Sequence, residues 1–125
     1  VAKKVTQLTQ PDPFDAHAGN SETSEMMAAQ PAVSHSERAG QQSGVDLERM
    51  KELQYVYTGI WWYASYPNHY GGDGSKSKAQ AGELLINETV SQLVKMIQQV
   101  KADKTVPELQ KQFFNEAENP LKTKQ

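Results

Sequence analysis

The chain contains no cysteine among its 125 residues. This absence excludes a disulfide framework, a thiolate nucleophile and a zinc site built from cysteine. A surplus of positive charge is also missing, because 13 Lys and Arg residues stand against 15 Asp and Glu residues, for a formal net charge of -2. Nucleic-acid-binding domains usually carry a basic surplus, so we expect no nucleic-acid partner.

Long hydrophobic runs are missing as well. The longest apolar run spans only a few residues, which is too short for a transmembrane helix, so we expect no membrane partner. Hydrophobic residues make up 37% of the chain and the mean hydropathy is -0.73, which predicts a small core for this length. We expect either irregular surface segments or a core that a partner completes.

The first residues predict little regular structure. Val1, Val5 and Leu8 could form one short strand at most, which Pro11 and Pro13 would end. No apolar stretch of the signal-peptide type follows the first residue, which is not Met. We therefore expect a processed product or a fragment, and the compartment stays open, with the cytoplasm favoured.

Three later segments have the spacing or the end signals of helices. Residues 21–30 are polar at the start and are followed by Pro31, which ends a helix. Residues 107–118 begin with proline, a favoured residue of the first turn. The clearest helix is residues 76–102, where apolar residues recur at three- and four-residue steps and predict a core or oligomer contact: Ala79, Ile86, Val90, Leu93, Ile97 and Val100.

The segments between these helices differ in composition. Residues 32–46 have almost no large apolar side chain, and we expect a surface loop there. Residues 47–53 suit a turn or two of helix. Residues 55–63 are dense in aromatic and β-branched residues, which predicts a strand or an aromatic-lined wall. Residues 66–75 are rich in turn-forming residues and predict a loop.

His17 and Glu22 form the first candidate pair for chemistry. The histidine ends a loop, the carboxylate lies in the first turn of the next helix, and Gly19 lets the backbone fold back between them. A histidine can move protons near neutral pH, and a glutamate can orient it or bind a metal. The alternative is structural, with Glu22 complementing the helix dipole and His17 an ordinary loop residue.

A second candidate region supplies a substrate pocket. His69 and Tyr70 lie in a glycine-rich loop of the kind that often binds ligands, although its polar side chains could equally cap one another. Trp61, Trp62 and Tyr63 could stack on a flat ligand or line a small pocket, and the alternative is an aromatic core or subunit contact. We expect His35, in the serine-rich segment, to be exposed to solvent.

Two segments together resemble the creatininase family, the creatinine amidohydrolases and their relatives. The first is His17-Ala18-Gly19-x-x-Glu22-Thr23-Ser24, followed by a short helix that ends at Pro31. The second is Gly72-Asp73 with Ala79 and Gly82-Glu83-Leu84-Leu85, at the opening of a long helix. The order of the motifs agrees with the family, and the resemblance covers roughly residues 12–31 and 57–102.

The resemblance implies a fold and a chemistry. The fold is α/β, here the C-terminal portion of a three-layer structure with a mainly parallel sheet between helices. The chemistry is metal-dependent hydrolysis of a C–N bond in a cyclic amide or related small molecule, in which water bound to two divalent ions, such as zinc, manganese or iron, attacks the carbonyl. By the same resemblance, His17 is the proton shuttle and Glu22 is a metal ligand or a neighbour of the ligands.

The sequence departs from the family where most of the metal is bound, because it contains neither Glu-x-His nor Asn-Gly-His. We therefore expect residues 1–125 to be the C-terminal part of one creatininase-like domain. Its partner would be the N-terminal half of the same protein or a companion chain, and alone it would neither fold well nor catalyse. Family analogy further implies a small-molecule substrate and a homo-oligomer, a hexamer.

Two other functions stay open beside the amidohydrolase. The aromatic region, residues 55–70, could make the chain a non-catalytic module that binds a small ligand. Alternatively, the chain could be an assembly subunit in which the helix over residues 76–102 packs in an oligomer. Two ordered motifs favour the amidohydrolase, and the content of metal in the purified protein separates it from a binding module.

Overall fold

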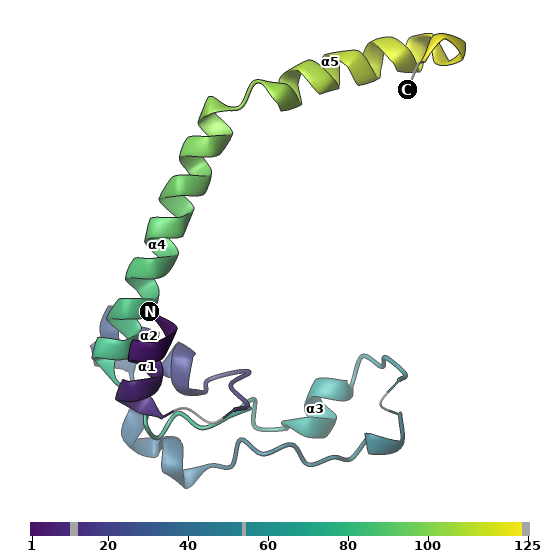
Figure 1. The fold of residues 1–125 in the computed structure, drawn as a ribbon. Helices are drawn as coiled ribbons and strands as arrows, with labels where there is room; N and C mark the ends of the chain where they lie inside the picture. Colours follow the sequence, from purple (N-terminus) through teal and green to yellow (C-terminus); the bar gives the residue numbers. More distant parts are fainter. Residues whose placement is uncertain (11–12, 54, 124–125) are drawn as a thin grey trace. The chain divides into compact units, whose positions relative to one another are not determined.

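A computed structural model describes residues 1–10, 13–53 and 55–123, whose course is drawn in Figure 1. The chain divides into two units, residues 1–89 and residues 90–125. The α-helices are α1 (Ala2–Thr9), α2 (Asn20–Ala29), α3 (Trp61–Ser65), α4 (Ala79–Ala102) and α5 (Thr105–Glu118). The 3-10 helices are η1 (Pro31–Val33), η2 (Ser36–Gln41), η3 (Lys51–Leu53) and η4 (Pro120–Lys122).

The expected α/β fold with a mainly parallel sheet is wrong for the part of the chain that the structure describes. There the regular elements are helices, and β-type pairing is limited to one isolated antiparallel bridge between His17 and Gly71. Residues 55–63, predicted as a strand or an aromatic wall, form turns and the first residues of α3. A strand needs neighbours to pair its N–H and C=O groups, and no described strand lies beside this segment.

The first residues form a helix where the sequence predicted a short strand. Val1, Val5 and Leu8 are separated by four and three residues, which is the repeat of one helical face and not the alternation of a strand. Val5 is buried on that face. Pro11, which was expected to help end this element, lies outside the described residues, as does Asp12.

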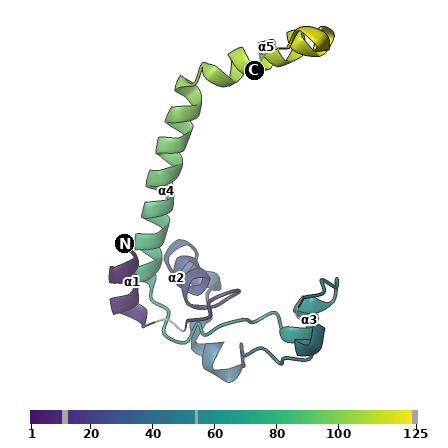
Figure 2. The ribbon, with the colours of Figure 1, turned by 45° about the vertical axis from the view of Figure 1, so that its right-hand side comes forward.

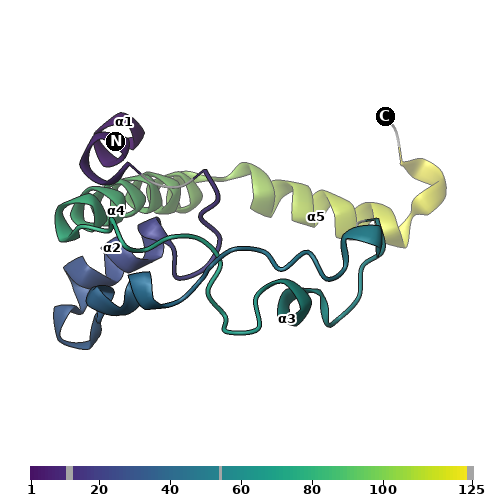
Figure 3. The same ribbon diagram turned by 90° about the horizontal axis from the view of Figure 1, so that it is seen from below.

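The most deeply buried residues of the unit over residues 1–89 lie where α2 packs against the first turns of α4. Asn20 and Ser24 on α2 and Ala81 on α4 are at most 1% exposed. The Ser24 Oγ accepts a hydrogen bond from the N–H of Lys78 at 3.1 Å. A Cβ atom on Gly82 would lie 2.0 Å from the Ser24 carbonyl oxygen, so the two backbones touch only because this residue is glycine. Figures 2 and 3 show α1 and α2 on either side of these turns.

Polar groups carry much of this contact. The Ser77 hydroxyl donates to the Asn20 carbonyl at 3.2 Å and ties the residues before α4 to the start of α2. The side-chain amide of Asn20 is buried, and neither its nitrogen nor its oxygen has a hydrogen-bond partner in the described ranges. Small and polar side chains therefore bring α2 and α4 together, not the large apolar stripe that the sequence predicted as a core contact.

The long helix predicted over residues 76–102 is α4, and it begins at Ala79. Before it, the Ser77 N–H donates to the Gly74 carbonyl at 3.1 Å, so these residues form a turn. Only the first part of the predicted stripe is covered, with Ala79 and Ile86 half-buried. The remaining apolar residues of the stripe are exposed: Val90, Leu93, Ile97 and Val100.

In residues 90–125, α5 begins at Thr105, two residues before the predicted proline. The helix begins there because the Asp103 carboxylate caps its first turn. It accepts hydrogen bonds from the N–H groups of Thr105 at 3.2 Å and Val106 at 2.9 Å. No described residue of this unit is buried. The exposed apolar side chains of α5 are Val106, Leu109, Phe113 and Phe114.

The segment over residues 32–46, expected as a surface loop, contains η1 and η2 and is largely exposed. At its end the Gly44 carbonyl accepts a hydrogen bond from the Gly72 N–H at 3.0 Å, and a Cβ atom on Gly44 would lie 2.0 Å from the Gly72 oxygen. Further on, the Arg49 guanidinium donates to the carbonyl groups of Ala64 and Tyr63 at the end of α3.

Among the described helices, none has the length and hydropathy needed to cross a membrane.

Candidate functional site

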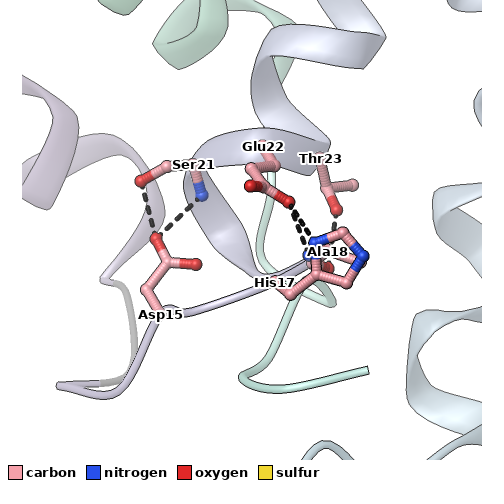
Figure 4. A network of polar contacts seen from close by, with 6 residues as sticks. All are labelled: Asp15, His17, Ala18, Ser21, Glu22 and Thr23. Carbon is pink, nitrogen blue, oxygen red and sulfur yellow. Dashed lines mark hydrogen bonds and ion pairs between the residues drawn. The ribbon is translucent and has the colours of Figure 1, made fainter. Parts of the chain in front are cut away.

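The loop that leads into α2 is attached to the first turn of that helix by side chains. The Asp15 carboxylate accepts hydrogen bonds from the backbone N–H of Ser21 at 3.0 Å and from its hydroxyl at 2.6 Å (Figure 4). The Thr23 hydroxyl donates to the Ala18 carbonyl at 2.9 Å. Ala18 has a positive φ of 53°, so the chain reverses at this residue. The helix start and the preceding turn therefore form one local unit.

His17 and Glu22 are in contact within this unit. The Nδ1 of His17 lies 3.1 Å from the Oε2 of Glu22, and the same oxygen accepts a hydrogen bond from the Ala18 N–H at 2.7 Å. About half of each side chain is exposed, 51% for His17 and 53% for Glu22. Figure 4 shows the other ring nitrogen, Nε2, on the side of the ring away from Glu22. The sequence placed these two residues in one space, and the structure brings them together.

His17 also contacts Gly71 and Trp62, which lie much later in the chain. The His17 N–H donates to the Gly71 carbonyl at 2.9 Å, and the Gly71 N–H donates to the His17 carbonyl at 3.0 Å. The ring of Trp62 meets the His17 ring edge-on, with 6.0 Å between the centroids. Two segments about fifty residues apart in sequence thus fix one histidine, through the backbone on one side and an aromatic ring on the other.

His17 and Glu22 line an open cavity of about 550 Å³. His69 and Tyr70, predicted as pocket residues, line the same cavity. His69 has a positive φ of 57°, and the Tyr70 hydroxyl accepts a hydrogen bond from the Gly74 N–H at 2.7 Å, which orders the loop. A cavity of this volume is in the range of small-molecule sites.

A comparison with protein-family models identifies the relationship: the creatinine amidohydrolase (creatininase) family matches residues 1–97. The chain belongs to the creatininase family. The resemblance drawn from the two motifs is therefore confirmed, and the match also includes the residues between them. Comparisons with curated proteins and with solved structures gave no match.

The three aromatic residues expected in the substrate pocket do not line the cavity that holds His17. Trp62 contacts the His17 ring and packs on Tyr66, with 4.7 Å between those centroids. Trp61 packs edge-on against Trp62 and lines a different hollow. Tyr63 lies 5.3 Å below the Arg49 guanidinium in a cation–π contact. Trp62 thus contacts the His17 ring from outside the cavity, whereas Trp61 and Tyr63 pack against other residues.

Two residues of the cavity were missed by sequence reasoning. His35 and Arg38, in the segment expected as a loop, line the cavity together with His17 and His69, so all three histidines of the chain face one space. His35 is exposed, as predicted. Its Nδ1 lies 3.2 Å from the Glu37 carboxylate. The signal in the sequence was a histidine, a glutamate and an arginine within four residues of an otherwise polar segment.

Three groups in this region have shifted pKa values. A hydrogen bond with its own backbone, together with His35 and Arg38, lowers the pKa of Glu37. Hydrogen bonds from Ser75 lower the pKa of Asp73. Burial, with Asp46 nearby, raises the pKa of the Tyr66 hydroxyl. The Tyr66 ring is part of the core, at 5% exposure, and stacks on Phe14 at 5.6 Å.

The residues that the structure describes do not form a metal site by themselves. Creatininases generally bind divalent metals, but within residues 1–10, 13–53 and 55–123 no three His, Asp or Glu side chains are grouped closely enough to hold an ion. The carboxylates near the cavity are already engaged, Glu22 with Ala18 and His17, and Asp15 with Ser21. The Glu22 Oε2 atom thus contacts both the Ala18 N–H and the His17 ring.

Proposed function

We propose that this chain supplies the proton-transfer end of an amidohydrolase site, with His17 as the group that carries the proton. The observation that supports this most directly is the contact of 3.1 Å between His17 Nδ1 and Glu22 Oε2 at the wall of a cavity of about 550 Å³. A histidine held on one ring nitrogen by a carboxylate has its other ring nitrogen available for a proton.

Glu22 is the positioning residue in this proposal. Its Oε2 also accepts the Ala18 N–H at 2.7 Å, so the carboxylate is fixed by the backbone before it meets the ring. The carboxylate favours the tautomer with a proton on Nδ1 and leaves Nε2 to exchange protons.

The reaction is the hydrolysis of an amide. The oxygen of water forms a bond to the carbonyl carbon, the C–N bond breaks, and one proton passes from the water to the leaving nitrogen. His17 Nε2 accepts that proton and then donates it to the nitrogen. The open cavity admits a small molecule, and we propose a cyclic amide or a related compound as the substrate.

The groups that activate the water are proposed to come from a partner. The sequence lacks Glu-x-His and Asn-Gly-His, and the described residues of this chain offer too few donors for an ion. We therefore propose that the N-terminal half of the protein or a companion chain binds the divalent ions, two of zinc, manganese or iron. A homo-oligomer, a hexamer by family analogy, is part of the same proposal.

The test is the effect of three substitutions on turnover by the protein together with its partner. His17→Ala should lower kcat by about 100-fold or more, the usual contribution of a proton-transfer group, and added imidazole should restore part of the rate. Glu22→Gln should lower kcat less and change its pH profile. Glu25→Gln is the matched control, because Glu25 lies one turn nearer the middle of α2 and does not line the cavity.

The measurement is hydrolysis of a panel of lactams, cyclic imides and creatinine, with metal content determined on the same samples. Normal turnover by His17→Ala with metal still bound would overturn the assignment of the histidine. Ligand binding without turnover in every pairing would favour the non-catalytic binding module instead.

A further inference from the structure

We propose that Arg38 and His35 form an anion-binding end of the same cavity, so that the substrate is an amide that carries a carboxylate. This inference rests on the proposed function and adds the class of substrate to it. Arg38 and His35 line the cavity of about 550 Å³ together with the His17 and Glu22 pair. One space therefore holds a proton-transfer group and a guanidinium.

The local structure aims Arg38 and His35 the same way. His35 precedes η2, and the Arg38 N–H donates to the His35 carbonyl at 3.0 Å. This bond closes the turn that opens η2, and both side chains line the same cavity. A planar guanidinium beside an imidazole offers several N–H donors, which suits the two oxygens of a carboxylate.

The charges around the cavity favour an anion at this end. Among the described residues that line it, Arg38 carries the guanidinium and Glu22 carries the carboxylate. The Glu22 carboxylate is engaged by the Ala18 N–H and by His17. The Glu37 carboxylate lies 4.0 Å from Arg38 Nε and outside the lining, so the terminal nitrogens of Arg38 can match the charge of a bound carboxylate.

Glu37 holds this end in place without occupying it. Its carboxylate lies 3.2 Å from His35 Nδ1 and 4.0 Å from Arg38 Nε, and it does not line the cavity. The longer distance exceeds a hydrogen bond, and a guanidinium has five N–H donors, so the terminal nitrogens of Arg38 stay available to a ligand. Glu37 thereby holds the His35 ring and leaves the guanidinium of Arg38 to a ligand.

The remaining wall suits a small apolar body between the two ends. Met26, Val33 and Ala39 line the cavity and contribute apolar surface. A ring of five or six atoms with one carboxylate is well within a cavity of this size. The combination is an amide that His17 can reach and a carboxylate that Arg38 binds.

Three small ligands separate the contributions of the amide and the carboxylate. The ligand 2-pyrrolidone is a cyclic amide, 5-oxoprolinate is the same ring with one carboxylate, and acetate is a carboxylate alone. Their dissociation constants are measured on the full chain, with any bound partner, by following the ring-proton NMR signals of the three histidines. We expect 5-oxoprolinate to bind about 10-fold more tightly than 2-pyrrolidone, a typical gain for a charge-assisted contact at a partly exposed site.

Substitutions at Arg38 and Lys51 test whether Arg38 causes the tighter binding of 5-oxoprolinate. In Arg38→Gln the ratio between the two lactams should fall close to one, and Arg38→Lys should restore part of it. Lys51→Gln is the matched control, since Lys51 is an exposed cation that lines a different hollow, and it should leave the ratio unchanged. Acetate should shift the His35 signal in the unaltered chain and not in Arg38→Gln.

Two results would overturn the inference. Equal binding of the two lactams by the unaltered chain, or a ratio that Arg38→Gln leaves unchanged, would remove the carboxylate site while the amide site stands. Absence of binding by both acetate and 5-oxoprolinate would also remove it, and the binding of 2-pyrrolidone would then decide separately whether the cavity accepts an amide.

Discussion

Residues 1–89 bury atoms from segments far apart in the sequence, whereas no described residue in 90–125 is buried. In the first unit, α2 contacts α4 through Ser24 and Gly82, and His17 is bonded to Gly71. In the second unit, α5 has a local cap from Asp103 and an apolar face that no described residue covers.

The difference between the two units shows which interactions stabilise each of them. The first unit is defined by close contacts such as those at Gly82 and Ser24. A larger side chain at Gly82, or an apolar one at Ser24, would destroy them. The proposed site lies within this unit. Helix propensity and local capping define the second unit, because none of its described residues is buried. Substitutions at the contact of α2 with α4 should therefore have large effects, and substitutions on the exposed faces should have small ones.

The largest effect is expected for Gly82→Ala. The added Cβ atom would lie 2.0 Å from the Ser24 carbonyl oxygen, a backbone atom that cannot rotate away. Such overpacking should lower the free energy of unfolding by about 3 kcal/mol, although alanine is the better helix former. Gly40→Ala is the control, because nothing lies within 4 Å of the new Cβ atom there. Urea unfolding followed by tryptophan fluorescence measures both variants, and equal stability would contradict the contact.

Ser24→Ala should have the next largest effect. The change leaves the Lys78 N–H without its acceptor at a position where Ser24 is fully buried. Loss of this hydrogen bond should lower the free energy of unfolding by about 1–2 kcal/mol. Ser91→Ala, on an exposed face of α4, should leave stability unchanged or raise it slightly. A cost for Ser91→Ala equal to that for Ser24→Ala would mean that burial does not distinguish the two serines.

A smaller effect that depends on pH is expected for Asp73→Asn. Hydrogen bonds from the hydroxyl and the N–H of Ser75, and then the charge of Lys76, lower the pKa of Asp73 from its ordinary value of 3.8. The ionised form therefore stabilises the folded state above pH 3.8, and this contribution is lost as the pH falls through the lowered pKa.

At pH 7, Asp73→Asn should lower the free energy of unfolding by about 0.5 kcal/mol, and the difference should vanish toward pH 3. Thermal unfolding measured at a series of pH values tests this, with Glu52→Gln in exposed η3 as the control. A difference that grows as the pH falls would contradict the sign.

The smallest effect is expected for the double substitution Leu93→Ala and Ile97→Ala. Both side chains are about half exposed on α4, and alanine is a good helix former. The free energy of unfolding of residues 1–89, which contain both tryptophans, should change by less than about 0.5 kcal/mol. A loss as large as that for Gly82→Ala would mean that another chain covers this face in the purified protein.

The site was predictable to the extent that it is local. His17, Gly19 and Glu22 lie within six residues, and the bonds that hold them run between the loop and the first turn of the next helix. The family resemblance pointed to the same residues. His35 and Arg38 were not predicted, because the path of residues 32–46 depends on contacts such as the bond between Gly44 and Gly72, which no local pattern encodes.

The sequence by itself determined the helices α2, α4 and α5, because the spacing of apolar residues, the capping groups and the prolines act within a few residues. It also determined the turn that joins His17 to Glu22. Tertiary structure decided that residues 55–63 form turns and a short helix, because a strand depends on a neighbour that sequence spacing does not reveal. It also decided which face of α4 is buried, because the close approach at Gly82 depends on a backbone from elsewhere in the chain.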